Sequence, residues 1–342
     1  MKPSFLPKAG AALVTGGALG GGGVAAYKHT TPRNWQEGLE WEGFSFIESI
    51  ENETEKANAY KAIYLSYKDS GISTDISGSN ADNNWNKIQE WCKSELGKPY
   101  KKWGEAANKE REKIIKYCED TRPVTVEAHL QKLGINKDLW IKNKSNDDDS
   151  YKIMFAVYRY YDPFLEEINK VEKEESKHNK DTAVDTGSER LKKYCEEQLS
   201  KKTKEVEDFE GLYNRLVWWC QPLEKTTVEE RIKQEHPGWE KEEEETSSDN
   251  GNGKWNQIKG YWQMTEVVFK VVKPGENNGQ NLQGSDYQKF CTDNLRKKLH
   301  ENDVYQKNYL VAKVVCVKQE VQAELFAIDL NKAIAKAAAK KE

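Results

Sequence analysis

The sequence lacks an excess of basic residues. Its 342 residues include 53 lysines and arginines against 57 aspartates and glutamates, which gives a formal net charge of −4 at pH 7 and an isoelectric point near 5.9. A protein that binds nucleic acid through the phosphates needs a basic patch or stripe. We therefore predict no nucleic-acid partner. Charges of both signs are mixed along the chain instead, a pattern typical of solvated helix faces.

Short motifs for a catalytic or metal site are also missing. No Cys-x-x-Cys, His-Glu-x-x-His, Gly-x-Ser-x-Gly or P-loop pattern occurs. The histidines are scattered, at His29, His129, His178, His236 and His300. We therefore predict no catalytic, cofactor-binding or metal-binding residue. A catalytic triad built from distant residues leaves no such motif, so an enzyme of unrecognised type remains an alternative.

The N-terminus contains an uncharged span. Residues 9–27, "AGAALVTGGALGGGGVAAY", follow Lys2 and Lys8. A basic start before an apolar run is typical of a signal peptide or a single membrane anchor, and we assign residues 1–28 to one of these. A phosphate-binding glycine loop is the weaker alternative, because no strand precedes the span and no Lys-Ser/Thr follows it. A signal peptide and a membrane anchor would both place the rest of the chain outside the cytoplasm.

Six cysteines suggest an internal repeat. The cysteines are Cys92, Cys118, Cys195, Cys220, Cys291 and Cys316, and they occur in pairs separated by 26, 25 and 25 residues. Five of the six directly follow an aromatic residue. The segment "YKAIYLSY" at 60–67 also resembles "YKIMFAVY" at 151–158. We predict a mainly α fold of three diverged helical-bundle repeats of about 100 residues, at 29–144, 145–250 and 251–342, after the N-terminal apolar span.

The helical prediction rests on spacing. Ile88, Cys92 and Leu96 share one face of a helix, as do Leu191, Cys195 and Leu199. The segments "EVVFKVV" and "YLVAKVVCV" are rich in β-branched residues and could be strands, but their place in the repeat favours helix. A C-terminal helix is predicted at 331–342. The polar runs 72–84, 172–188, 240–254 and 274–285 are predicted to be exposed.

One phrase occurs twice, as "KYCEDTRPVTVE" at 116–127 and "WWCQPLEKTTVE" at 218–229. Thr226 and Glu229 fit a capping box, and Thr125 fits the N-cap of the corresponding helix, with Glu127 in its first turn. The phrase therefore predicts the end of one helix and the start of the next. A catalytic role for Glu127 and Glu229 is the alternative.

The cysteine pairs allow four interpretations. The first is one disulfide in each repeat, Cys92–Cys118, Cys195–Cys220 and Cys291–Cys316, across a helical hairpin; an exported protein with an even number of cysteines fits this. Buried reduced thiols beside aromatics are the second. Metal ligation and a nucleophilic cysteine are the third and fourth, and neither has a supporting motif. In the disulfide interpretation, the aromatics before paired cysteines should also lie close together.

The chain resembles the paralogous proteins of haemotropic mycoplasmas. The likeness lies in the glycine- and alanine-rich N-terminal span, the lysine- and glutamate-rich helical body, and the phrases "KKYC", "WWC" and "RPVTVEAHL". The resemblance implies a wall-less bacterium, a membrane-facing or secreted location, and expansion by duplication. It implies no functional residues.

We expect a non-enzymatic surface protein, anchored in the membrane through residues 9–27 or secreted. Its variable polar loops would bind a host molecule or another surface protein. A secreted hydrolase of unrecognised type and a structural membrane-associated protein facing the cytoplasm are the alternatives.

Overall fold

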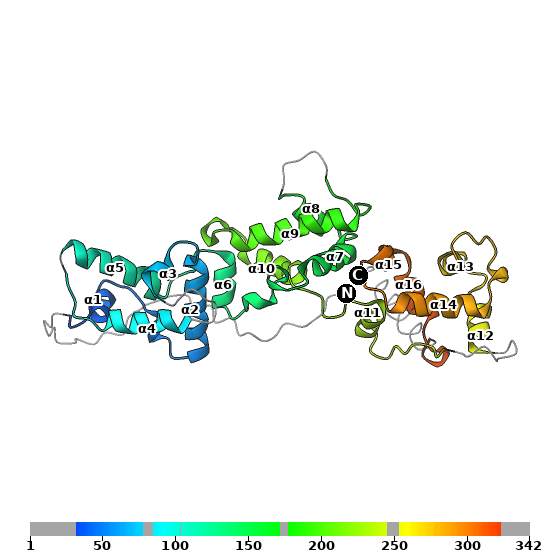
Figure 1. Ribbon diagram of the computed structural model, residues 1–342, viewed down its shortest axis with the longest axis horizontal. Coiled ribbons are helices and arrows are strands. Elements are labelled where there is room, and N and C mark those ends of the chain that lie inside the picture. Colours follow the sequence, from blue (N-terminus) through cyan, green and yellow to red (C-terminus); the bar gives the residue numbers. More distant parts are fainter. Residues whose placement is uncertain (1–31, 78–84, 103, 172–176, 245–252, 323–342) are drawn as a thin grey trace, which may run out of the picture.

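Helices form around all six cysteines, as the spacing predicts. The computed structural model describes residues 32–77, 85–102, 104–171, 177–244 and 253–322 (Figure 1). These residues form helices and turns and contain no strand, only isolated bridges. The mainly α prediction is confirmed. The β-branched segments of the C-terminal part are also helical, because tertiary packing outweighs their weak intrinsic preference for strands.

The helices fall into three regions, which we define as residues 32–122, 123–225 and 226–322. The first region contains α1 (Trp35–Trp41), η1 (Ile47–Ser49), α2 (Glu53–Tyr67), α3 (Ile72–Asp75), α4 (Trp85–Leu96) and α5 (Glu105–Cys118). The second contains α6 (Val126–Lys132), η2 (Lys137–Leu139), η3 (Ile141–Asn143), α7 (Asp147–Tyr158), α8 (Asp162–Ile168), α9 (Val184–Ser200), η4 (Thr203–Glu205) and α10 (Phe209–Trp219). The third contains α11 (Val228–Glu235), α12 (Lys254–Trp262), α13 (Glu266–Val272), η5 (Gly279–Asn281), α14 (Gly284–Leu295), η6 (Glu301–Asp303), α15 (Val304–Lys307) and α16 (Tyr309–Val315).

The short first helix of each region is tied to the segment that follows the first cysteine helix. The N-cap residue of the short helix forms an isolated antiparallel bridge with that segment, and the next backbone N–H donates to a lysine carbonyl. The bridges are Asn34–Pro99, Thr125–Lys202 and Thr227–Lys298, and the hydrogen bonds are Trp35–Lys98 at 3.0 Å, Val126–Lys201 at 2.9 Å and Val228–Lys297 at 3.0 Å. The helices that begin at Thr-Val-Glu are thereby held to the cysteine helices that come after them in the chain.

The capping box of α11 lies one residue later than predicted. Thr227 is the N-cap residue and Glu230 is its partner; the Glu230 amide donates to Thr227 Oγ1 at 3.3 Å, and Glu230 Oε2 accepts from the Thr227 amide at 3.1 Å. The pair Thr226 and Glu229 is wrong. Val228 is completely buried and sets the start of the helix, so the cap must be the residue before it. The predicted N-cap at Thr125 is confirmed.

Polar composition was a poor guide to exposure at the edges of the polar runs. Ile72 and Ile76 are buried in 72–84, Ser188 in 172–188, Glu242 in 240–254 and Leu282 in 274–285. All four runs overlap helices, because α3 lies within 72–84, α9 begins at Val184, α12 begins at Lys254 and α14 begins at Gly284. Single apolar residues in a polar segment anchor it to the core, an effect that average composition does not reveal.

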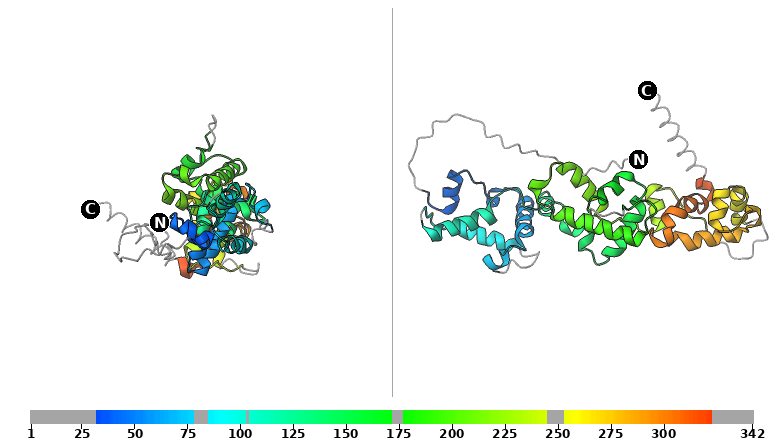
Figure 2. Two further views of the ribbon diagram at one scale, coloured as in Figure 1. Left: turned by 90° about the vertical axis from the view of Figure 1, so that its left-hand side faces the viewer. Right: turned by 90° about the horizontal axis from the view of Figure 1, so that it is seen from above.

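Each region has its own hydrophobic core. The largest buried side chains include Trp35 and Tyr60 in the first region, Trp140 and Phe164 in the second, and Trp239 in the third. The regions follow one another in a row, and Figures 1 and 2 show α1 near one end of this row and α12 and α13 at the other. Within the described ranges, no helix has both the length and the apolar character needed to span a bilayer. The predicted span at 9–27 and the predicted helix at 331–342 lie outside those ranges.

Candidate functional site

All three predicted disulfides are present. The Cα–Cα distances are 5.6 Å for Cys92–Cys118, 5.6 Å for Cys195–Cys220 and 5.5 Å for Cys291–Cys316. The cysteines are at most 3% exposed, and none is free. The prediction of one bond within each pair is confirmed, and the alternatives of buried thiols, metal ligands or a nucleophilic thiol are wrong.

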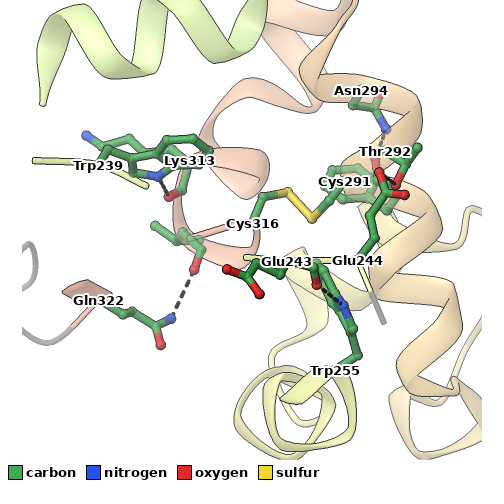
Figure 3. Close-up of a disulfide and its surroundings, with 12 residues drawn as sticks. Trp239, Glu243, Glu244, Trp255, Cys291, Thr292, Asn294, Lys313, Cys316 and Gln322 are labelled. Atoms are coloured by element: carbon green, nitrogen blue, oxygen red, sulfur yellow. Dashed lines mark hydrogen bonds between the residues drawn. A yellow bond between two sulfur atoms is a disulfide. The ribbon is translucent and has the colours of Figure 1, made fainter. Parts of the chain in front are cut away.

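The disulfides join neighbouring helices at matching places in the chain. α4 pairs with α5, α9 with α10, and α14 with α16, and each of these helix pairs is in contact. The second cysteine stands at the C-terminal end of its helix in every pair. Figure 3 shows the third disulfide between α14 and α16, with Trp239 and Trp255 beside it. Each bond therefore links two helices through a buried sulfur pair, and in the third region η6 and α15 lie between the linked helices.

Aromatic rings surround the first two disulfides. The rings of Trp91 and Tyr117 lie 5.9 Å apart, and those of Tyr194 and Trp219 lie 6.1 Å apart. Trp219 also packs edge-on against Phe164 at 5.2 Å. The prediction that these aromatics meet is confirmed. Such contacts exclude water from the sulfurs and add to the stability of the hairpin.

The third disulfide has a different neighbour, the buried carboxylate of Glu242. The Glu242 amide donates to the Cys316 carbonyl at 2.8 Å, just as the Ile141 amide donates to the Cys220 carbonyl at 2.9 Å. Glu242 thus occupies a position that holds isoleucine in the second region. Glu242 is 3% exposed, and its Oε1 accepts from Lys254 Nζ at 3.3 Å. Within the described residues, Oε2 is buried without a hydrogen-bond partner.

A small cavity adjoins this carboxylate. Its volume is about 20 Å³, and its lining includes Glu242, Trp255, Cys291 and Arg296. That is room for about one water molecule, which could hydrogen-bond to the orphaned oxygen. In the sequence, Glu242 lies within "EKEEEE", a composition that is typical of a solvated segment. The burial of Glu242 becomes evident only from the fold, in which its backbone amide is paired with the Cys316 carbonyl.

Replacing Glu242 with isoleucine should raise the free energy of unfolding by about 1 kcal/mol, because a buried carboxylate loses hydration that one long ion pair restores only in part. Lys254 is half-exposed and can be hydrated by solvent when its partner is removed. Urea denaturation would measure the change. Glu243→Ile is the matched control, because Glu243 is exposed and its replacement should have little effect. A loss of stability in Glu242→Ile would contradict this interpretation.

His129 is a half-buried histidine in strongly perturbed surroundings. It lies on α6, and its ring packs edge-on against Phe209 of α10 at 4.5 Å. The pKa of His129 is lowered to about 4, mainly by burial and in part by the nearby Arg122 and Lys132 cations. The imidazole is therefore neutral at physiological pH and serves as a packing group in the second region.

This pKa predicts an acid-sensitive fold. The unfolded chain binds a proton on His129 near pH 6.5, whereas the folded chain binds it only near pH 4. Between these values the unfolded state holds more protons, so stability falls as the pH falls. Allowing for partial exposure, the loss should be about 1–2 kcal/mol. His129→Gln should reduce this slope in thermal unfolding followed from pH 7 to 4, and an unchanged slope would refute the assignment.

The two glutamates weighed as catalytic residues lie in different regions. Glu127 is 7% exposed and accepts from Lys142 Nζ at 2.8 Å, while Glu229 accepts from Lys233 Nζ at 2.6 Å. Each carboxylate is thus part of an ion pair in its own region, and the structure does not bring the two together. A second cavity, of about 70 Å³, lies between α2 and the segment 131–138. Both cavities are well below the 300–1,000 Å³ typical of small-molecule sites.

Aromatic stripes divide between core and surface. Tyr60 and Trp219 are buried, whereas Trp218 is 52% exposed. Adjacent positions on a helix point about 100° apart, so only one of this tryptophan pair can face the core. No group of three or more histidine, cysteine, aspartate or glutamate side chains in the described ranges has the arrangement of a metal site.

Comparison with known proteins gives no relatives. No family model matches the sequence, and no curated protein or solved structure matches it either.

Proposed function

We propose that this chain is a non-enzymatic protein of the cell exterior that acts by binding. In this proposal, residues 9–27 anchor it in the membrane or direct its secretion. The three disulfides are the observation that carries the proposal, because such bonds form and persist mainly in oxidising compartments. The resemblance to paralogous proteins of haemotropic mycoplasmas is consistent with an exterior location.

We further propose that the chain consists of three diverged copies of one helical unit. Each region has a short first helix, a second helix that contains a buried aromatic residue, and two disulfide-linked helices in the same order, which supports this. So do the matched hydrogen bonds to Lys98, Lys201 and Lys297. These bonds favour unit boundaries near residues 122 and 225, one short helix earlier than the boundaries at 144 and 250 drawn from composition.

The binding surfaces in this proposal are the exposed faces of the row, not a deep cleft. Several large apolar side chains are exposed, among them Trp41 on α1, Trp218 on α10, Tyr261 on α12 and Met264 in the turn that follows α12. Tyrosine and tryptophan are enriched at binding hot spots because they offer a large contact area with few rotatable bonds. The partner would be a host molecule or another surface protein.

The location can be tested on intact cells. Protease added outside the cells should cleave the protein, and mass spectrometry after alkylation without reductant should find all six cysteines unmodified. Fractionation should place it in the membrane or the medium. Protection from external protease together with alkylated thiols would refute the exterior location. A cytoplasmic marker protein that stays uncut would control for lysis.

The binding role can be tested with the purified chain. A panel of red-cell, serum and bacterial surface proteins would be screened by surface plasmon resonance. Trp218→Ala should weaken the interaction if α10 takes part, with Lys204→Ala on the same region as the control. A screen without any ligand, combined with a hydrolytic activity in the same preparation, would favour the hydrolase.

A further inference from the structure

At both junctions a helix of one region packs against the region that follows, but the partner helix differs: α2 contacts α6 at the first junction, whereas α7 contacts α15 at the second. At the first junction, Ala62 and Leu65 of α2 pack against Ala128 of α6. The Val124 amide donates to Ser66 Oγ at 3.2 Å. At the second junction, Ile153 and Val157 of α7 pack into the core of the third region. In each case one helix, α2 or α7, packs against the region that follows its own.

The corresponding second helix of the third region is α12, which has 9 residues, against 15 in α2 and 12 in α7. Buried aromatic residues mark the equivalent first positions, Tyr60, Tyr151 and Trp255, and buried aliphatic residues follow three positions later, Ile63, Met154 and Ile258. In this register Gly260 corresponds to Leu65, and Tyr261 corresponds to Val157. The receiving face of α12 therefore includes Gly260 and Tyr261, and Met264 follows in the turn after the helix.

This face is open. Tyr261 is 66% exposed and Met264 is 74% exposed. Beyond its own helix backbone, no described atom lies within 4 Å of where a Cβ on Gly260 would lie. In the first two regions the corresponding face is covered by the next region, and α12 lies at the end of the row (Figure 1).

The opposite end of the row presents the complementary element. α1 corresponds to α6, since both begin after an N-cap residue bridged to the cysteine hairpin. Glu37 corresponds to Ala128, the residue that α6 places on α2. Near it, Trp41 is 63% exposed and Glu40 is exposed. α1 thus offers a large aromatic side chain and two carboxylates at the end where no earlier region is described.

We propose that copies of this chain associate head to tail, with α1 of one copy packed on the open face of α12 of another. The interface would repeat the first junction of the chain, in which α6 packs on α2. Trp41 would lie over Gly260, between Tyr261 and Met264. The charges are complementary, because α1 carries Glu37 and Glu40 whereas α12 carries Lys254 and Lys259.

Such contacts would produce open chains of copies. A head-to-tail interface that does not close into a ring leaves one free end on each side. Within the chain the same type of junction is helped by covalent linkage, which provides an effective concentration of about 1 mM or more. Between copies this help is missing, so association should be weak and depend on concentration. At an exterior surface, where copies are crowded, it would order them into rows.

The test uses the full chain and two end-blocked variants. Trp41→Glu blocks the α1 end, and Tyr261→Glu blocks the α12 end; both sites are exposed, so folding should be retained and can be checked by circular dichroism. Trp218→Glu, exposed in the middle of the row, is the control. Sedimentation equilibrium would cover a hundredfold concentration range up to about 0.5 mM, where weak contacts are populated.

The unmodified chain and the Trp218→Glu control should rise in average mass above 39.4 kDa as concentration increases. Each end-blocked variant alone should remain a monomer. An equimolar mixture of the two should form a dimer and nothing longer, because one intact α1 end meets one intact α12 end. A monomeric unmodified chain, association of either blocked variant alone, or a monomeric mixture would each overturn the proposal.

Discussion

Replacing both Cys195 and Cys220 with alanine should lower the free energy of unfolding by about 3.5 kcal/mol. The bond closes a loop of 25 residues, and losing it allows the unfolded chain many more conformations. Both residues are completely buried, so the removed sulfurs also leave small unfilled spaces in a core that includes Trp219 and Phe164. Guanidinium denaturation followed by tryptophan fluorescence would measure the loss.

Controls can separate the crosslink from the packing. Cys195→Val with Cys220→Ala restores part of the volume and should recover only a fraction of the loss, because the loop remains open. Reductant should destabilise the unmodified chain further than it destabilises the double variant, which has one bond fewer to lose. If the double variant were as stable as the unmodified chain under oxidising conditions, the disulfide would contribute nothing to this region.

The cysteine pairs were predictable because their signal is local and periodic. A cysteine after an aromatic residue recurs at a constant separation, and helical spacing places Cys92 with Ile88 and Leu96 on one buried face. Two cysteines about 25 residues apart on a helical hairpin lie at the same end of the hairpin, so their side chains come close together. The N-cap at Thr125 was predictable for a similar reason, since its side chain accepts from the Ala128 amide only three residues later.

The features that join distant segments were not predictable in this way. Nothing near Glu242 in the sequence indicates that its backbone pairs with Cys316, and composition alone places it in solvent. Likewise, Thr125 precedes Lys202 by many residues, so no local pattern reveals that α6 belongs with the helices after it. The N-cap of α11 is Thr227 and not the predicted Thr226, and the reason is again tertiary: burial of Val228 decides which threonine caps the helix.

The junction between the second and third regions depends on one buried cation, Arg159. It is 3% exposed, at the C-terminal end of α7. Its Nη1 donates to the Thr182 carbonyl at 3.2 Å, and its Nη2 donates to Asp303 Oδ1 at 3.1 Å and to Gln306 Oε1 at 2.8 Å. The guanidinium therefore ties a loop of its own region to two elements of the next.

Asp303 is held in place from both sides. Burial raises the pKa of its carboxyl group, but hydrogen bonds from Arg159 and Lys307 outweigh this and lower the pKa overall. Asp303 also has a positive φ of 54°, which no other non-glycine residue in the described ranges shares. A conformation this uncommon for aspartate persists when neighbouring contacts hold it, and Arg159 supplies one of them.

Arg159→Leu should therefore lower the free energy of unfolding by about 2–3 kcal/mol, since three hydrogen bonds from a charged donor are lost and their acceptors are left without it. Hydrogen exchange should also accelerate at the amides of residues 301–307, because the loosened contact lies there. The matched control is Lys298→Ala, which removes an ion pair with Asp149 across the same junction. Both of those side chains are more than two-fifths exposed, so this pair should contribute less than about 1 kcal/mol. Equal losses in the two variants would show that burial gives Arg159 no special role, and that packing of Ile153 and Val157 holds the junction instead.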